Sequence, residues 1–92
     1  RLSVLSEYLL PFVRIGGRAI ALKGMRYAEE VQEAKYAVRI LGGAKIEEIP
    51  VTLPSLSDKR AVLVMKKVRE TPRTYPRKAG MPTKFPLVQV DY

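Results

Sequence analysis

The sequence contains no cysteine and no histidine. Without cysteine the chain can form no disulfide and offers no thiolate nucleophile, and without histidine it lacks imidazole catalysis and the usual zinc ligands. The closest group of acids, Glu29, Glu30 and Glu33, has the spacing of a solvated helix face, and the sequence offers no complementary ligands beside it. We therefore expect no metal site in this chain.

Long apolar runs are also missing. No stretch approaches the ~20 residues that cross a bilayer, and the N-terminal residues show no signal-peptide pattern. We expect a soluble, cytoplasmic protein without a membrane partner. A length of 92 residues allows one small domain at most.

Positive charge is abundant and unevenly distributed. Lysine and arginine outnumber aspartate and glutamate by 17 to 9, and residues 66–92 contain only two acids, Glu70 and Asp91. A cationic excess on an extended segment favours a polyanion partner, because binding releases the counterions of phosphates. The alternative is a tail that only keeps the protein soluble. A membrane-surface helix is disfavoured, because these cations do not follow an amphipathic helical pattern.

Two helices and a strand are indicated in the first half. The leucine spacing predicts a helix over residues 2–13 that bends or restarts at Pro11 and ends before a pair of glycines. The short apolar run at residues 18–23 predicts a strand buried on both faces. Residues 26–41 have apolar positions every three or four residues and predict the second helix, which a second glycine pair ends.

Two more strands follow. Residues 44–52 form the first, and Pro50 argues for an edge position. Residues 60–68 are rich in valine and predict a buried strand. The link between them is too short for a crossover helix, so we expect antiparallel pairing. Arg60 would then pair across the hairpin with Glu47 or Glu48.

The predicted order of elements is helix, strand, helix, antiparallel hairpin and extended tail. This order indicates an α/β fold corresponding to half of an open sheet, which leaves a long unpaired edge. The chain also begins at Arg1 without a cap for its first helix. Both features suggest a fragment of a longer protein, with a partial domain over residues 1–68 and a basic, proline-rich tail over residues 69–92 that packs on the domain or extends from it.

The tail includes the stretch "TYPRKAGMPTKFP", residues 74–86. Its three prolines predict that it is neither a helix nor a buried strand. Pro76, Pro82 and Pro86 would hold the backbone extended and reduce the entropy lost on binding. Gly80 would permit a tight turn.

Several side chains are candidates for contacts with nucleic acid. The planar fork of Arg77 suits two phosphate oxygens, although a salt bridge or a carbonyl contact that fixes the tail is the alternative. Tyr75 or Phe85 would stack on an unpaired base, or instead pack the tail onto the domain. Lys23 ends the strand expected at the centre of the sheet, where open α/β sheets hold ligands; it would face RNA or be a solvated strand end. The predicted RNA-binding residues are Lys23, Arg73, Arg77, Lys78 and Lys84.

Three stretches, "EYLLPFVRIGGRAIALKG", "AEEVQEAKYAVRILGG" and "RAVLVMKKVRETPRTYPRKAGMPTKFPL", together resemble a known family. It is the bacterial 16S ribosomal RNA guanine-N7 methyltransferase family, also called glucose-inhibited division protein B, and the similarity is to its C-terminal half. The resemblance extends from about Leu5 to Leu87, and its most specific part is "YPRKAGMPTKFPL".

The resemblance implies a Rossmann-like methyltransferase fold, in which a seven-stranded sheet has its last strand inserted antiparallel. It also implies S-adenosylmethionine as methyl donor and guanine N7 of 16S ribosomal RNA, free or in the small-subunit particle, as acceptor. The glycine-rich loop and the acidic residue that hold the cofactor in such enzymes would lie before Arg1. We therefore expect no cofactor-binding residue here and assign no catalytic residue.

Two other readings remain open. The chain would be a small, self-contained basic protein that binds RNA or associates with the ribosome without catalysis, or a structural module whose tail straps the sheet. If it is instead part of the methyltransferase, we expect the isolated chain to bind RNA weakly and to methylate nothing.

Overall fold

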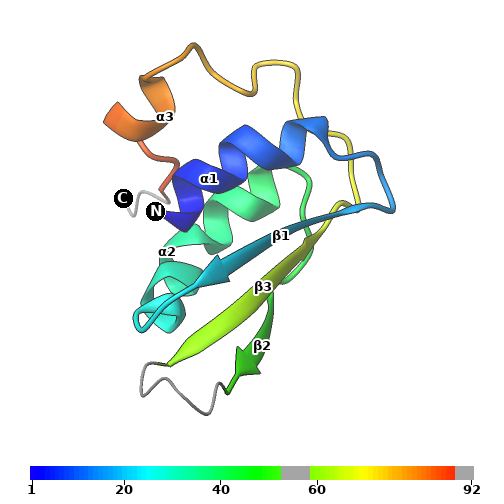
Figure 1. The fold of residues 1–92 in the computed structure, drawn as a ribbon. Helices are drawn as coiled ribbons and strands as arrows, with labels where there is room; N and C mark the ends of the chain where they lie inside the picture. Colours follow the sequence, from blue (N-terminus) through cyan, green and yellow to red (C-terminus); the bar gives the residue numbers. More distant parts are fainter. Residues whose placement is uncertain (53–58, 89–92) are drawn as a thin grey trace.

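In the computed structural model, which describes residues 1–52 and 59–88, two main helices cover a small sheet (Figure 1). The predicted α/β class and the order helix, strand, helix, hairpin are confirmed. Most of the turn predicted between the last two strands lies outside the described residues. The elements are α1 (Leu2–Leu9), the 3-10 helix η1 (Leu10–Phe12), β1 (Arg18–Lys23), α2 (Tyr27–Ile40), β2 (Glu47–Val51), β3 (Arg60–Lys66) and α3 (Met81–Lys84).

The sheet has the strand order β1-β3-β2. Strand β3 is antiparallel to both neighbours, so β1 and β2 run parallel to each other, with α2 between them in sequence. The predicted antiparallel hairpin is confirmed, and so is the edge position of β2. Pro50 lies on that edge strand opposite Ala61, where the missing N–H of proline is tolerated.

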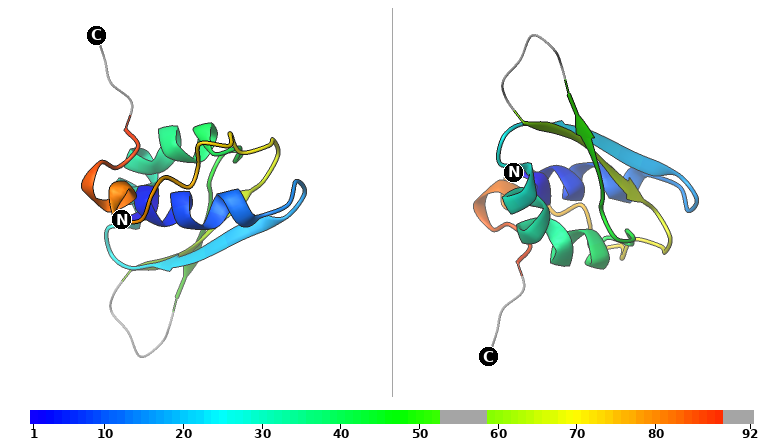
Figure 2. Two further views of the ribbon diagram at one scale, coloured as in Figure 1. Left: turned by 90° about the horizontal axis from the view of Figure 1, so that it is seen from above. Right: turned by 90° about the horizontal axis from the view of Figure 1, so that it is seen from below.

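Helices α1 and α2 lie on the same face of the sheet (Figure 2). The side chains of Ala19, Ala21 and Ala61 on this face are short and buried, which lets the helices approach closely. In helix α2 the predicted apolar residues Val31, Ala34 and Val38 are buried against the core, and Ala37 is buried beside them. The core consists of Leu2, Leu10, Ala19, Ala21, Val31, Ala34, Ala37, Val38, Leu41, Ile46, Ala61, Leu63 and Met65.

The prediction that residues 18–23 form a strand buried on both faces was wrong in one respect. The strand is present with those bounds, but its burial alternates, and Ile20 and Leu22 are each 61% exposed. Both main helices lie on the other face of the sheet, so nothing among the described residues covers these two side chains. Strand β1 is also an edge of this sheet, and the central strand is β3.

The predicted ion pair between Arg60 and Glu47 or Glu48 was also wrong. The strand register places Glu47 opposite Val64, Glu48 opposite Leu63 and Arg60 opposite Val51. The carboxylate of Glu47 instead lies 3.6 Å from the amino group of Lys66. Register is fixed by pairing along the whole strand, which residue types alone do not reveal.

The predicted restart at Pro11 and the glycine closure of the second helix are confirmed, whereas the first helix ends at Phe12, before the glycine pair expected to end it. Pro11 lies in the first turn of η1, where the chain restarts after α1. Helix α2 ends at Ile40, with Leu41 as its C-cap. Gly42 follows with a φ of +95°, and the Gly43 N–H donates to the carbonyl oxygen of Val38 at 2.8 Å. This left-handed closure favours glycine because a side chain would be strained there.

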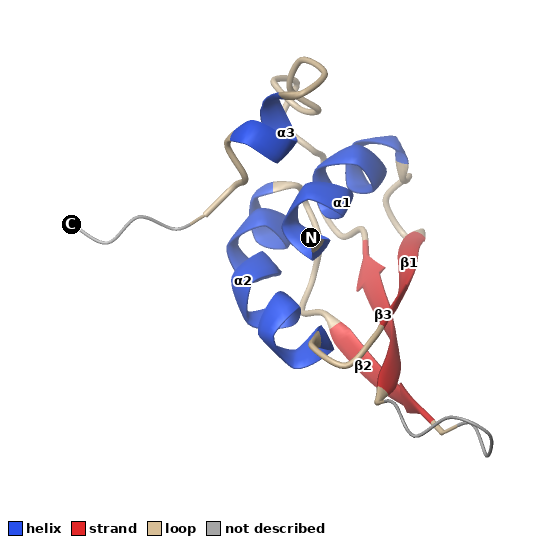
Figure 3. Ribbon diagram, turned by 60° about the vertical axis from the view of Figure 1, so that its left-hand side comes forward, coloured by secondary structure: helices blue, strands red, loops and turns tan. Residues whose placement is uncertain are grey.

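The tail folds back toward α1 (Figure 3). The expectation that residues 74–86 contain no helix was wrong, because Met81–Lys84 forms the single turn α3. Pro82 is buried within its first two positions, where proline costs no helical hydrogen bond. Gly80 makes the predicted turn with a φ of +88°.

Candidate nucleic-acid interface

The tail is anchored by an ion pair between Arg77 and Glu7 of α1. The guanidinium Nη2 donates to Glu7 Oε1 at 2.8 Å and Nε donates to Oε2 at 3.0 Å, while the backbone N–H of Arg77 donates to Oε2 at 2.9 Å. Nη2 also donates to the carbonyl oxygen of Phe85 at 2.6 Å. These contacts match the alternative reading, in which Arg77 fixes the tail.

The pair is well buried on the helix side. The Glu7 side chain is 1% exposed and that of Arg77 is 24% exposed. Burial alone would raise the pKa of Glu7, but the side-chain and backbone hydrogen bonds from Arg77 and its positive charge together lower that pKa below its ordinary value. The hydrogen bond to Glu7 raises the pKa of Arg77. Both groups are therefore charged at neutral pH.

Lys23 also has a protein partner. Its amino group lies 3.1 Å from Glu30 Oε1 on α2. The same oxygen accepts a hydrogen bond from the Leu2 N–H at 3.0 Å and so caps the start of α1. Lys23 therefore joins the end of β1 to the first turns of both helices.

The other predicted tail cations are exposed. Arg73, Lys78 and Lys84 all point to solvent, and the amino group of Lys84 lies 5.7 Å from the centroid of the Phe85 ring. Phe85 is 54% exposed, whereas Tyr75 packs against the core. The structure thus leaves three cations and one aromatic ring of the predicted interface open to a partner.

Lys67 belongs to the cation-rich residues 66–92, yet it is only 3% exposed. Its amino group donates to the carbonyl oxygens of Leu10 at 2.6 Å and Val13 at 2.9 Å, at the end of η1. Burial lowers the pKa of Lys67, and the charge of Glu70 acts in the opposite direction. The neighbouring Lys66 is exposed, as expected from the alternation of side chains along a strand.

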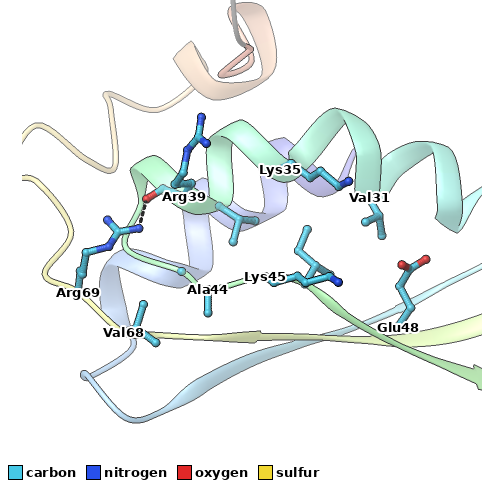
Figure 4. Close-up of a pocket in the computed structure, with 11 residues that line it drawn as sticks. Val31, Lys35, Arg39, Ala44, Lys45, Glu48, Val68 and Arg69 are labelled. Carbon is cyan, nitrogen blue, oxygen red and sulfur yellow. Dashed lines mark hydrogen bonds between the residues drawn. The ribbon is translucent and has the colours of Figure 1, made fainter.

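A second group of cations surrounds a hollow of about 610 Å³ between α2 and the chain that leads into β2 (Figure 4). These cations were not predicted as a group from the sequence. The only signal was the four-residue spacing of Lys35 and Arg39, which places both on one side of α2. We call this hollow the α2 groove; its lining residues are Val31, Lys35, Val38, Arg39, Gly43, Ala44, Lys45, Ile46, Glu48, Val68 and Arg69.

Within residues 1–52 and 59–88, no helix has the length and apolar character needed to cross a membrane. No three acidic side chains within them come together as a candidate metal site.

Comparison with known proteins gives a clear relationship. The chain is 49% identical over 88 residues to ribosomal RNA small subunit methyltransferase G of Lactobacillus johnsonii, and 52% identical over 89 residues to the protein of that name from Macrococcus caseolyticus. The matched region is 95% and 97% of this chain, respectively. This chain is homologous to part of the ribosomal RNA small subunit methyltransferase G proteins. The predicted resemblance is thereby confirmed.

The chain spans only about 36% of the length of the Lactobacillus johnsonii protein and 37% of the Macrococcus caseolyticus protein. A relative from Bacillus cytotoxicus shows the same pattern, with 49% identity over 87 residues and 36% of its length covered. No protein-family model matches the chain.

Proposed function

We propose that this chain is part of an S-adenosylmethionine-dependent methyltransferase that modifies guanine N7 in 16S ribosomal RNA. The observation that carries the proposal is identity of about half the residues, across nearly the whole chain, with proteins named as ribosomal RNA small subunit methyltransferases. Because the chain spans about a third of those proteins, the activity belongs to a longer protein. In bacteria, ribosomal RNA is assembled into ribosomal subunits in the cytoplasm, and we propose that the protein acts there.

The sheet topology supports a Rossmann-like methyltransferase fold. Such a sheet is expected to end with one strand inserted antiparallel between two parallel ones. Strand β3 has this relation to β1 and β2, and α2 is the helical connection between the two parallel strands. A helical crossover is the usual way to join parallel strands.

The proposed reaction agrees with the composition. Guanine N7 carries a lone pair and no proton, so its methylation needs no general base. A chain without histidine or cysteine is therefore suited to it, and catalysis would depend on holding the reacting groups in line. The purine gains positive charge during the reaction, so cations are better placed on phosphates than against the base.

The connection between β1 and α2 does not have the form of a glycine-rich loop that cradles S-adenosylmethionine. Gly24 is the one glycine between β1 and α2, and a Cβ added there would meet no atom within 4 Å. A glycine-rich turn that cradles a cofactor has closely approaching backbone instead. We derive no catalytic step through the cofactor from these residues.

We propose that the tail contacts the RNA through Arg73, Lys78 and Lys84, with Phe85 available for an unpaired base. These cations are exposed and no acidic partner is found for them among the described residues. The other two predicted RNA-binding residues, Lys23 and Arg77, are engaged by Glu30 and Glu7. We propose that these two hold the interface in place and contact RNA only through donors left over from those pairs.

A chimera tests the function. The matching region of the Lactobacillus johnsonii protein is replaced by this chain, and the purified chimera is given S-adenosylmethionine and small ribosomal subunits. We expect a methyl group at guanine N7 of 16S ribosomal RNA, detected by chemical cleavage of the RNA at 7-methylguanine. A chimera that folds and binds the cofactor but methylates no such guanine would contradict the proposal.

The tail contacts are tested in the same chimera. The triple variant Arg73→Gln, Lys78→Gln, Lys84→Gln should raise KM for RNA about tenfold or more and leave kcat and the melting temperature nearly unchanged, because it removes only phosphate contacts. The isolated chain should bind no S-adenosylmethionine by calorimetry. Clear binding would show that the cofactor site lies in these residues.

A further inference from the structure

The α2 groove combines an apolar floor with a cationic rim (Figure 4). The apolar floor is accessible to a ligand, because the Val68 side chain is 48% exposed. Helix α2 forms one wall, and the irregular chain that enters β2 forms the other. This chain is held to β3 by the Ala44 N–H, which donates to the carbonyl oxygen of Lys66 at 2.9 Å. The floor consists of Val31, Val38, Ala44, Ile46 and Val68.

The rim carries an excess of positive charge. Lys35 and Arg39 lie four residues apart on α2, about 6 Å along its axis. Lys45 comes from the opposite wall and Arg69 from the end that follows β3. Glu48 is the one acid among the lining residues. A polyanion is therefore the partner whose charge matches the groove.

The groove is continuous with the tail. Arg69 is the first tail residue and also lines the groove. Its Nη2 donates to the carbonyl oxygen of Arg39 at 2.9 Å, which holds the guanidinium at the C-terminal end of α2. Arg69 therefore brings a cation of the tail to the rim of the groove.

We propose that the α2 groove binds a short single-stranded segment of the RNA, with phosphates at the cationic rim and a base or ribose against the apolar floor. This inference rests on the proposed function, because the ligand is the RNA substrate. A duplex keeps its bases stacked inside and would leave the apolar floor unused, whereas unpaired nucleotides can turn a base toward it. The floor contains no aromatic ring, so we expect little preference for base identity.

Glu48 makes the two ends of the groove different in charge. Figure 4 shows it at the end opposite Arg69. Its carboxylate would repel a phosphate but can accept a hydrogen bond from a ribose 2′-hydroxyl, which DNA lacks. Phosphates are therefore placed toward Arg39 and Arg69, and a ribose toward Glu48.

The test measures the affinity of the 92-residue chain for a fluorescent single-stranded oligoribonucleotide at several salt concentrations. The groove variant is Lys35→Gln, Lys45→Gln, in which neither lysine has a hydrogen-bond partner among the described residues. We expect affinity to fall about five- to tenfold at low salt, and the slope of log K against log salt to fall by about 1.4, or 0.7 per cation.

The matched control is Arg26→Gln, Lys59→Gln, which removes the same charge. Arg26 precedes α2 and lies about 20 Å along the helix axis from Arg39. Lys59 precedes the start of β3, whereas Arg69 follows the end of that strand. We expect this control to bind within about twofold of the wild type. Equal losses in the two variants would mean that only net charge matters, which would overturn the inference.

The apolar floor is tested separately by Val68→Ser, with inorganic polyphosphate as a second probe. We expect a few-fold loss of affinity for the oligoribonucleotide and none for polyphosphate, because polyphosphate has no base or ribose to place on the floor. Equal affinity of wild type and Val68→Ser for the oligoribonucleotide would contradict the proposed use of the floor.

The outcomes separate this inference from the proposed function. If the tail variant loses affinity and the groove variant behaves like its control, only the groove inference fails. If the wild-type chain binds no oligoribonucleotide, the groove inference fails together with the proposed tail contacts. Methylation by the chimera tests the reaction independently of both.

Discussion

Glu7 and Arg77 are 70 residues apart in sequence and form the ion pair that holds the tail against α1. The carboxylate receives hydrogen bonds from the guanidinium and also from the backbone N–H of Arg77. The pair therefore fixes the backbone of the tail as well as a side chain. The turn α3 begins four residues later; the exposed Lys78 precedes it, and the exposed Lys84 is its last residue.

Replacing Glu7 by glutamine should destabilise the protein by about 2–4 kcal/mol, because it leaves a partly buried guanidinium without its countercharge. The measurement is the free energy of unfolding from urea titration. The control is Glu33→Gln, which breaks the pair with Arg1 between side chains that are each about half exposed and should cost no more than about 0.5 kcal/mol. Equal effects of the two substitutions would contradict a special role for Glu7.

The stability that Glu7 contributes should depend on acid pH. Its pKa in the folded chain lies below the ordinary value of about 4.3. The contribution is therefore complete above that ordinary value and is lost as the pH falls through the lowered pKa. The difference in unfolding free energy between wild type and Glu7→Gln should shrink as the pH is lowered from 6 toward 3. A difference that stays constant over this range would refute the assignment.

Gly42→Ala should destabilise the fold by more than about 1 kcal/mol. Gly42 has a φ of +95°, and a Cβ there would lie against the carbonyl group of Arg69. Gly24→Ala is the control, because a Cβ at Gly24 would meet nothing within 4 Å and its φ is not positive. It should leave the melting temperature unchanged or slightly raised. A similar loss in both variants would indicate a general cost of replacing glycine.

Lys67→Met should cost about 1–3 kcal/mol, because the buried carbonyl of Leu10 loses its hydrogen bond. Lys66→Met removes the same charge from the adjacent residue, which is exposed and 3.6 Å from Glu47, and should change stability by no more than about 0.5 kcal/mol. Thermal melts of the two variants provide the comparison. If Lys66→Met proves the more damaging, the assignment of Lys67 as the structural lysine is wrong.

Local patterns explain why much of the fold was predictable. The spacing of apolar residues located α2, the glycine at its end marked the closure, and Pro50 indicated an edge strand. Each of these signals acts through neighbouring residues or through the backbone of a single residue. The cation-rich tail and the family resemblance were equally visible in the sequence.

The roles of individual charges were not predictable in this way. Arg73 and Arg77 are both arginines of one proline-rich stretch, yet Arg77 is paired with Glu7 and Arg73 is exposed. The groove cations come from α2, from the chain before β2 and from the start of the tail, so no single stretch contains the pattern. Contacts between distant segments depend on how the elements pack, which residue types do not specify.

The two main helices, the three strands, the α/β class and the excess of positive charge at the C-terminal end followed from the residues alone, because propensity, periodicity and charge are properties of short stretches. The short helix α3 did not. Only the tertiary structure decided that Ile20 and Leu22 face outward, that Lys67 is buried beside an exposed Lys66, and that Arg77 serves as an anchor. The physical reason is that burial and ion pairing depend on which distant surface lies opposite a side chain, and that is fixed only when the helices, sheet and tail have packed together.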